Sequence, residues 1–204
     1  TTRYDTGDLS ESLTSTLHEF GHALCFLGLD RENYANPLGE SRDLAVHESQ
    51  SRLWENQVGR SKPFWRLMLP EVRERFPGTE DVTVEDCYQS LNYYDPENLI
   101  RVQADEVSYH IHIVLRFELE RALINGEIEV EELPELWNQK MVEYLRKQPE
   151  TDLEGVLQDI HWFQAGFGYF PTYSLGSVIS AQIFEAAERE IENLEEKIEQ
   201  GEFE

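Results

Sequence analysis

The chain has 204 residues and a formal net charge of −24, from 17 Lys and Arg against 41 Asp and Glu. This excess of negative charge argues against binding to nucleic acids or to anionic membranes. No apolar run reaches the roughly 20 residues that span a bilayer. The two cysteines, Cys25 and Cys87, are too few for a disulfide framework, so a reducing cytoplasm is expected. The Glu-rich, Lys-poor composition fits either salt adaptation or an ordinary acidic protein, and both interpretations stay open.

Helical periodicity dominates the sequence from its start. Spacings of three and four residues predict a first helix over 9–27, ended by Gly28, whose apolar stripe faces the core and comprises Leu13, Leu17, Phe20, Leu24 and Leu27. A polar loop over 30–39 follows, with a turn signal at Asn36-Pro37-Leu38-Gly39. Ser41 or Asp43 is expected to cap a second helix that runs to about position 58.

The rest of the chain continues the helical pattern. Thr83 and Asp86 resemble a capping box at the start of a short helix. Further helices are predicted over 83–94, 104–125, 131–147 and 177–200. An ordered loop is expected over 163–176, where aromatic residues alternate with glycines, and one short strand over 99–102. The fold class is therefore all-α with at most a short β element, in a single segment over 1–204. Because the chain begins with Thr1 rather than Met, we expect a fragment truncated at both ends.

The segment His18-Glu19-Phe20-Gly21-His22 is an H-E-x-x-H motif within the first predicted helix. At 100° per residue the two histidines lie about 40° apart on one face, roughly opposite the apolar stripe. Both imidazoles can then reach a single Zn²⁺. Glu19 lies beside them, where it can contact a water on the metal. The alternative is a chance match on an amphipathic helix whose polar face is merely solvated.

A catalytic zinc site needs a third protein ligand and an open position. Glu48, in His47-Glu48-Ser49-Gln50 on the next predicted helix, is the candidate, and Glu55 on the same helix is its competitor. Taken alone, His47-Glu48 would more often be a pair of solvated polar side chains on the surface of a helix. Beside a two-histidine motif, one carboxylate of this helix becomes the expected ligand.

Arg101 precedes a long predicted helix, in Ile100-Arg101-Val102-Gln103-Ala104-Asp105. The guanidinium group forms a planar fork that matches a carboxylate, so an arginine near a zinc ion could hold the C-terminus of a peptide. The competing interpretation is a structural salt bridge to Asp105 or Glu106. His110 and His112 would face different sides of their helix and are interpreted as structural.

The segment 155–162, Gly-Val-Leu-Gln-Asp-Ile-His-Trp, places His161 shortly before Tyr169 and Tyr173. In a zinc peptidase the developing oxyanion needs hydrogen-bond donors besides the metal, and His or Tyr can supply them. An aromatic-lined core loop remains the interpretation for most of these side chains.

Together these segments resemble the carboxypeptidase Taq family of zinc metallocarboxypeptidases, also called thermostable carboxypeptidase 1. Residues 18–22 match its zinc motif, 47–50 its third-ligand motif, 100–105 its I-R-x-x-A-D signature and 155–162 its G-x-x-Q-D-x-H-W signature. Four signatures in order make the match specific, and it covers essentially the whole chain. Family members are more than twice this length. Their H-P-F signature and most of their D-x-R-x-T signature would lie before Thr1.

The resemblance implies a broad-specificity peptidase, usually a homodimer, with a helical groove related to those of angiotensin-converting enzyme and neurolysin. It implies that His18, His22 and Glu48 bind Zn²⁺ or another divalent ion such as Co²⁺, with Glu19 as general base. By the wider analogy, His161 and one of Tyr169 or Tyr173 would face the scissile carbonyl. Two alternatives remain: an endopeptidase of the same architecture with a structural Arg101, or a non-catalytic fragment.

Overall fold

The computed structural model describes residues 7–203, and the two chain ends that suggested a fragment lie outside this range. The described part is helical and contains no β-strand. It divides into two compact units, one of residues up to Asn92 together with those from Leu175 on, the other of Tyr93–Ser174. Each unit is described separately. The single catalytic-domain segment expected for 1–204 stays a prediction.

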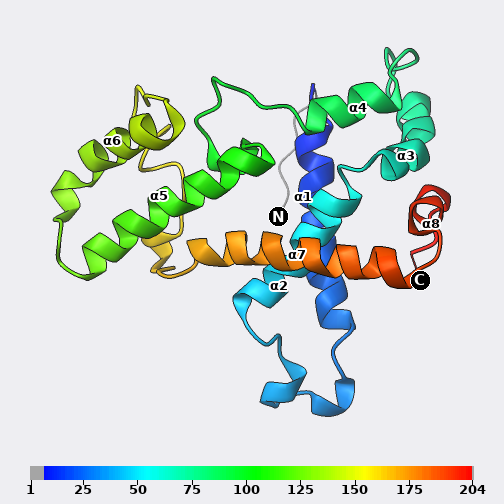
Figure 1. Cartoon of the computed structure of the whole chain (residues 1–204), viewed down its shortest axis with the longest axis horizontal. Helices are drawn as coiled ribbons and strands as arrows, with labels where there is room; N and C mark the ends of the chain where they lie inside the picture. Colours follow the sequence, from blue (N-terminus) through cyan, green and yellow to red (C-terminus); the bar gives the residue numbers. More distant parts are fainter. Residues whose placement is uncertain (1–6, 204) are drawn as a thin grey trace. The chain divides into compact units, whose positions relative to one another are not determined.

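The first unit contains most of the helices. Its elements are α1 (Ser10–Leu27), α2 (Leu44–Arg52), a π-helical segment η3 (Leu53–Val58), α3 (Lys62–Arg75), α4 (Val84–Leu91), α7 (Phe170–Glu190) from Leu175 on and α8 (Leu194–Gln200). Helix α1 packs on α2 and on η3, and α3 packs on α4 and α8 (Figure 1). The buried core of this unit comprises Val58, Phe64, Trp65 and Ile198. Leu13 and Leu17 of α1 pack against it.

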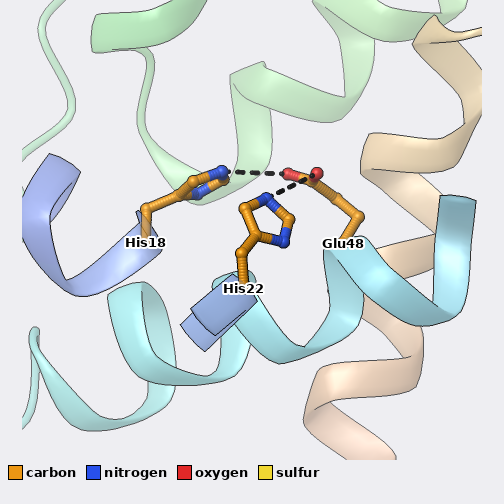
Figure 2. Close-up of side chains that lie close together, drawn as sticks. All are labelled: His18, His22 and Glu48. Atoms are coloured by element: carbon orange, nitrogen blue, oxygen red, sulfur yellow. Dashed lines mark ion pairs between the residues drawn. The ribbon is translucent and has the colours of Figure 1, made fainter. Parts of the chain in front are cut away.

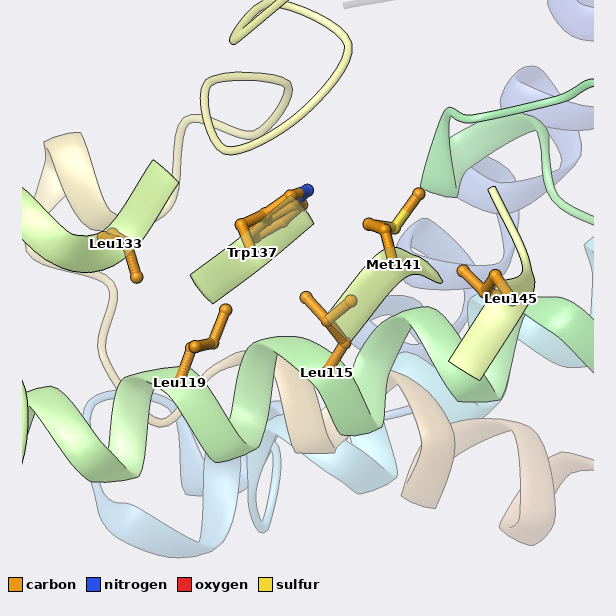
Figure 3. Close-up of a cluster of buried hydrophobic side chains, with 6 residues drawn as sticks. All are labelled: Leu115, Leu119, Leu133, Trp137, Met141 and Leu145. Carbon is orange, nitrogen blue, oxygen red and sulfur yellow. The ribbon is translucent and has the colours of Figure 1, made fainter. Parts of the chain in front are cut away.

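The second unit is built on two helices, α5 (Glu106–Ile124) and α6 (Leu133–Leu145), which run back alongside each other (Figure 1). Apolar side chains at helical spacing on both helices close the gap between them. Figure 3 shows this core, which comprises Leu115, Leu119, Leu133, Trp137, Met141 and Leu145. Burial of several large apolar side chains, each contributing about 1.5–3 kcal/mol, stabilises the pair.

The caps predicted from the sequence are found where they were expected. Asp43, rather than Ser41, caps α2 and accepts from the backbone of Val46 at 2.8 Å. Thr83 and Asp86 form the capping box of α4, and Gly28 ends α1. These caps satisfy backbone groups that a helix leaves unpaired at its ends. The sequence therefore located these helix ends correctly, although α4 ends at Leu91, earlier than predicted.

Three expectations about the elements were wrong, and one helix was missed. The short strand over 99–102 is absent, and a 3-10 turn over Arg101–Gln103 stands in its place, because this helical unit offers no partner strand. The loop over 163–176 ends at position 169, where buried Phe170 begins α7 and Pro171 occupies its first turn. The helix over 177–200 is broken between α7 and α8, where Asn193 adopts a left-handed conformation with φ 58°. Helix α3 was not predicted at all.

The apolar stripe of α1 is only partly buried. Leu13 and Leu17 pack into the core as expected, but Phe20 and Leu27 are exposed, at 43% and 69%. The buried residue of this helix is Gly21, on the side that faces α2. The imidazoles of His18 and His22 therefore point onto α2 rather than away from the packed face. Across residues 7–203, every helix is too short or too polar to cross a membrane.

Candidate metal centre

Three side chains from two helices meet where α1 packs on α2. His18 and His22, one turn apart on α1, present their Nε2 atoms to the carboxylate of Glu48 on α2 (Figure 2). The distances are 3.5 Å from His18 Nε2 to Glu48 Oε1 and 3.6 Å from His22 Nε2 to Glu48 Oε2. One ligand atom from each residue lies within 4.8 Å of the other two. These three residues form a group that could hold a metal ion.

Two glycines allow the helices to approach closely at this group. A Cβ atom on Gly21, between the two histidines, would lie 2.3 Å from the backbone oxygen of Gln50. On the other side, a Cβ atom on Gly176 of α7 would lie 2.9 Å from the Cβ of Glu48. Both distances are shorter than real Cβ contacts, so only glycine allows this packing. The backbone thus brings Glu48 to the histidines.

The electrostatics of the group fit a bound cation. Glu48 is 1% exposed, and its Oε1 has no hydrogen-bond donor among the described residues. Burial raises the pKa of Glu48, although the charges of His18 and Arg52 act against the rise. Burial, followed by the charges of His18 and His47, lowers the pKa of His22 to about 4, so its ring is neutral at pH 7. A neutral imidazole and a carboxylate without a donor are what a divalent metal ion requires.

Glu55 lies close to the group but on the other edge of the His18 ring. Its Oε2 is 2.8 Å from His18 Nδ1, and the same oxygen accepts from Arg52 Nη1 at 2.8 Å. Burial alone would raise the pKa of Glu55, but Arg52 and His18 lower it to about 2. Burial would lower the pKa of His18, but the hydrogen bond to Glu55 and the charges of Glu55 and Glu48 together raise it. Glu48, and not its competitor Glu55, shares the metal-holding group.

Glu19, the predicted general base, lies on α1 directly after His18 and is exposed.

In the second unit, Arg101 is buried, with 4% of its surface exposed. It forms a salt bridge, but with Asp159 rather than with Asp105 or Glu106, so the predicted partners were wrong. Its Nε and Nη2 donate to Asp159 Oδ1 at 3.1 and 2.6 Å, and its Nη1 donates to the Tyr109 hydroxyl at 3.0 Å.

Asp105 instead caps α5, accepting from the backbone of Val107 and Ser108. A second buried arginine, Arg116 of α5, shares the partner of Arg101. Its Nε donates to Asp159 Oδ2 at 2.7 Å and its Nη2 to Gln158 Oε1 at 2.7 Å. Arg116 was not predicted from the sequence as a residue of this group. The available signal was a charged residue inside the apolar run 113–117 of a long helix.

The remaining predicted residues of the second unit lie together. The Nε2 atom of His161 is 3.0 Å from the Tyr173 hydroxyl, and its ring lies 5.4 Å from that of Tyr169. Burial and the charge of Arg101 lower the pKa of His161. His161 and the two tyrosines therefore form one aromatic and polar cluster next to Asp159, whose Oδ1 is 3.9 Å from His161 Nδ1.

Comparison with known proteins agrees with this geometry. The family model described as carboxypeptidase Taq (M32) metallopeptidase matches residues 1–204. The chain belongs to this family. It is 48% identical to thermostable carboxypeptidase 1 of Thermus thermophilus over 203 residues, which are 100% of this chain and 40% of that protein.

Solved structures show the same fold in M32 relatives. A Pyrococcus furiosus carboxypeptidase is 44% identical with a TM-score of 0.94, and it covers 100% of this chain and 41% of its own. The M32 carboxypeptidase of Deinococcus radiodurans R1 is 41% identical with a TM-score of 0.91, covering 99% and 41%. The chain thus spans about 40% of the length of the curated relatives that it matches.

Proposed function

We propose that the M32 enzyme to which this chain contributes is a zinc metallocarboxypeptidase, which hydrolyses the last peptide bond of a broad range of peptides. The observation that carries the proposal is the convergence of His18, His22 and Glu48, with a buried Glu48 oxygen that has no donor among the described residues. The names of the relatives support the reaction class. Hydrolysis of any peptide by the 204-residue chain itself would exclude the alternative of a non-catalytic fragment.

His18, His22 and Glu48 would hold the metal ion, which we propose to be Zn²⁺ because two imidazoles and one carboxylate are a common catalytic zinc set. When bound, zinc supplies Lewis-acid polarisation of the scissile carbonyl and makes water a nucleophile near neutral pH. Co²⁺ is the alternative ion, since it accepts the same ligand types. Metal analysis of the purified enzyme identifies the ion.

The other predicted residues would act on the substrate. Glu19 is exposed beside His18, where its carboxylate can accept the proton of the attacking water and deliver it to the leaving amine. His161, with Tyr169 or Tyr173, would donate hydrogen bonds to the negatively charged oxygen that develops on the scissile carbonyl. The hydrogen bond between His161 and Tyr173 supports a shared role for this pair.

Arg101 would bind the terminal carboxylate of the substrate. A guanidinium group has five donor hydrogens, and Asp159 and Tyr109 use three of those of Arg101. One hydrogen on Nη1 and one on Nη2 remain for a ligand, which is the number that a bidentate carboxylate needs. The burial of Arg101 and its pairing with Asp159 also favour the second candidate, an endopeptidase in which this arginine is structural.

Replacing Arg101 with Ala in the complete enzyme distinguishes the two candidates. A charge-assisted contact of this kind is worth roughly 1.5–3 kcal/mol, so kcat/KM should fall about tenfold or more. The fall should be confined to peptides with a free C-terminus, and amidated peptides should be poor substrates throughout. Arg101→Lys keeps the charge but loses the fork and should recover only part of the activity.

The control for this experiment is Arg121→Ala, which removes an exposed arginine of α5 in the same unit. It should leave kcat/KM unchanged. Equal losses on free and amidated peptides, with wild-type enzyme cleaving both, would instead identify an endopeptidase with a structural Arg101.

Assembly and location are also part of the proposal. The homodimer and the cytoplasmic location rest on the family resemblance and on a chain whose two cysteines, Cys25 and Cys87, are both free. Sedimentation of the complete enzyme and fractionation of its source cells measure the two properties directly.

A further inference from the structure

The two histidines of the metal centre differ in their second ring nitrogen. His18 Nδ1 lies 2.8 Å from Glu55 Oε2, whereas His22 Nδ1 is buried and lies against no carboxylate of the described residues. On both rings Nε2 is the atom that faces Glu48. A carboxylate thus contacts the far edge of one ligand ring and not of the other.

The position of Glu55 is itself fixed by buried neighbours. Arg52, which is buried, donates from Nη1 to Glu55 Oε2 at 2.8 Å and from Nε to the Ser177 hydroxyl at 3.2 Å. The amide of Asn56 is best oriented with its oxygen toward Arg52, where it accepts from Nη2 at 2.9 Å. Arg60 Nη2 lies 3.8 Å from the other oxygen of Glu55. Two cations therefore hold this carboxylate against the imidazole.

Glu55 also lies on an unusual piece of backbone. It belongs to η3, the π-helical segment that continues α2 without a break. Such widened turns are rare in proteins and occur often at functional sites. Glu48 of α2 and Glu55 of η3 therefore belong to one continuous helix. Glu48 faces Nε2 of the His18 ring and Glu55 contacts its Nδ1.

We propose that Glu55 is a positioning residue of the metal centre. Its carboxylate accepts the Nδ1 hydrogen of His18, which selects the tautomer whose Nε2 lone pair faces the metal position and fixes the plane of the ring. A hydrogen bond from the second ring nitrogen to a carboxylate is a general way to orient a ligating histidine. This inference rests on the proposed metal site at His18, His22 and Glu48. It assigns to Glu55 a role that is neither ligand nor catalyst.

The test uses Glu55→Ala and Glu55→Gln in the complete enzyme, with zinc affinity measured by competition with a chelator at one fixed pH. Loss of such a partner typically weakens metal binding about 10- to 100-fold, which we expect for Glu55→Ala. Glu55→Gln keeps an acceptor oxygen without the charge and should lose less. The matched control is Glu71→Gln, because Glu71 also pairs with an arginine, Arg75, but contacts no histidine.

A second measurement needs no metal. Nitrogen-15 NMR of the histidines in the metal-free enzyme, recorded at a pH well above the raised pKa of His18, should find this ring in the Nδ1–H tautomer. In Glu55→Ala it should find a mixture in which the Nε2–H form has grown, while Glu71→Gln resembles the wild type. A merely structural role for Glu55 would change the melting temperature without changing this tautomer.

The outcomes separate this inference from the metal site on which it rests. Wild-type enzyme that binds no zinc through His18 and His22 would remove the site and the inference together. Tight zinc binding by the wild type, with Glu55→Ala within about twofold of it and His18 still Nδ1–H, would overturn the inference alone. If Glu55→Ala does not fold, Glu55→Gln decides by the same two readouts.

Discussion

Glu48 in the first unit and Asp159 in the second are both buried carboxylates, and their surroundings differ in one respect. Glu48 has an oxygen with no donor among the described residues, and burial raises its pKa. Asp159 accepts from Arg101 and Arg116 on its two oxygens. Burial alone would raise its pKa, but the charges of these arginines lower it to about 2. Asp159 is therefore satisfied by the fold, whereas Glu48 is left available for a ligand.

The comparison separates residues that serve the reaction from residues that serve the fold. A buried polar group costs stability unless it is paired, so an unpaired oxygen of a carboxylate that faces two imidazoles is a candidate position for a bound cation. By the same argument, the paired Arg101 is partly structural even if it also binds substrate. Three experiments test this division.

The largest effect is expected on the turnover of Glu19→Gln, which changes a residue assigned to the reaction. Removing a general base typically lowers turnover about 10²- to 10⁴-fold. Because Glu19 is exposed, the free energy of unfolding should change by less than about 0.5 kcal/mol. Zinc affinity should stay near that of the wild type. Steady-state kinetics of the complete enzyme measures turnover, and urea unfolding measures the free energy of unfolding. Near-normal turnover would show that Glu19 is not the general base.

The next largest effect is the difference in unfolding free energy between Asp159→Asn and Glu48→Gln in the metal-free enzyme. Removing Asp159 leaves two buried arginines without their carboxylate, which should cost about 3–5 kcal/mol of unfolding free energy. Removing the charge of Glu48 should cost little or stabilise, because that charge has no donor on Oε1.

Urea unfolding in excess chelator measures this difference. Glu118→Gln is the control, since its ion pair with Lys140 is partly exposed and should be worth less than about 1 kcal/mol. Equal destabilisation by Asp159→Asn and Glu48→Gln would contradict the division between the two carboxylates.

The smallest effect is a dependence of stability on pH. The pKa of Asp159 is about 2 in the folded protein and 3.8 in its ordinary state, so the unfolded chain binds the proton more readily. Its contribution of about 2 kcal/mol is therefore present above pH 4 and is lost as the pH falls from about 4 to 2. Asp159→Asn should lack this component. The unfolding free energies of the wild type and of Asp159→Asn are measured between about pH 4 and pH 2, and the change in their difference gives the contribution of Asp159. If the difference stays constant across this range, the ion pairs of Asp159 are not the source of the pH dependence.

Local patterns predicted the helices and the metal-holding group because both depend on short spacings. His18 and His22 are one turn apart, and the caps at Asp43 and Thr83 lie within a few residues of the groups that they bind. Helix α3 was missed because Pro70 lies inside it and removes a backbone donor. Its start was nevertheless readable from Ser61 followed by Pro63 at the first turn.

The partners of Arg101 and Glu55 could not be predicted in this way. Arg101 is 58 residues from Asp159, and His18 is 37 residues from Glu55. Carboxylates nearer in sequence, such as Asp105, offered an equally good chemical match to Arg101, and only the packing of the helices selects among them. The sequence thus indicated which chemistry is present, while the tertiary fold decided which groups meet.

Gly21 determines how closely α1 can approach α2 at the metal-holding group. Since a side chain there would collide with the backbone of Gln50, the gap between α1 and α2 is set by contact of the two main chains, before any ion arrives. Any larger residue at position 21 would therefore push α1 away from α2 and carry the imidazoles of His18 and His22 away from the Glu48 carboxylate.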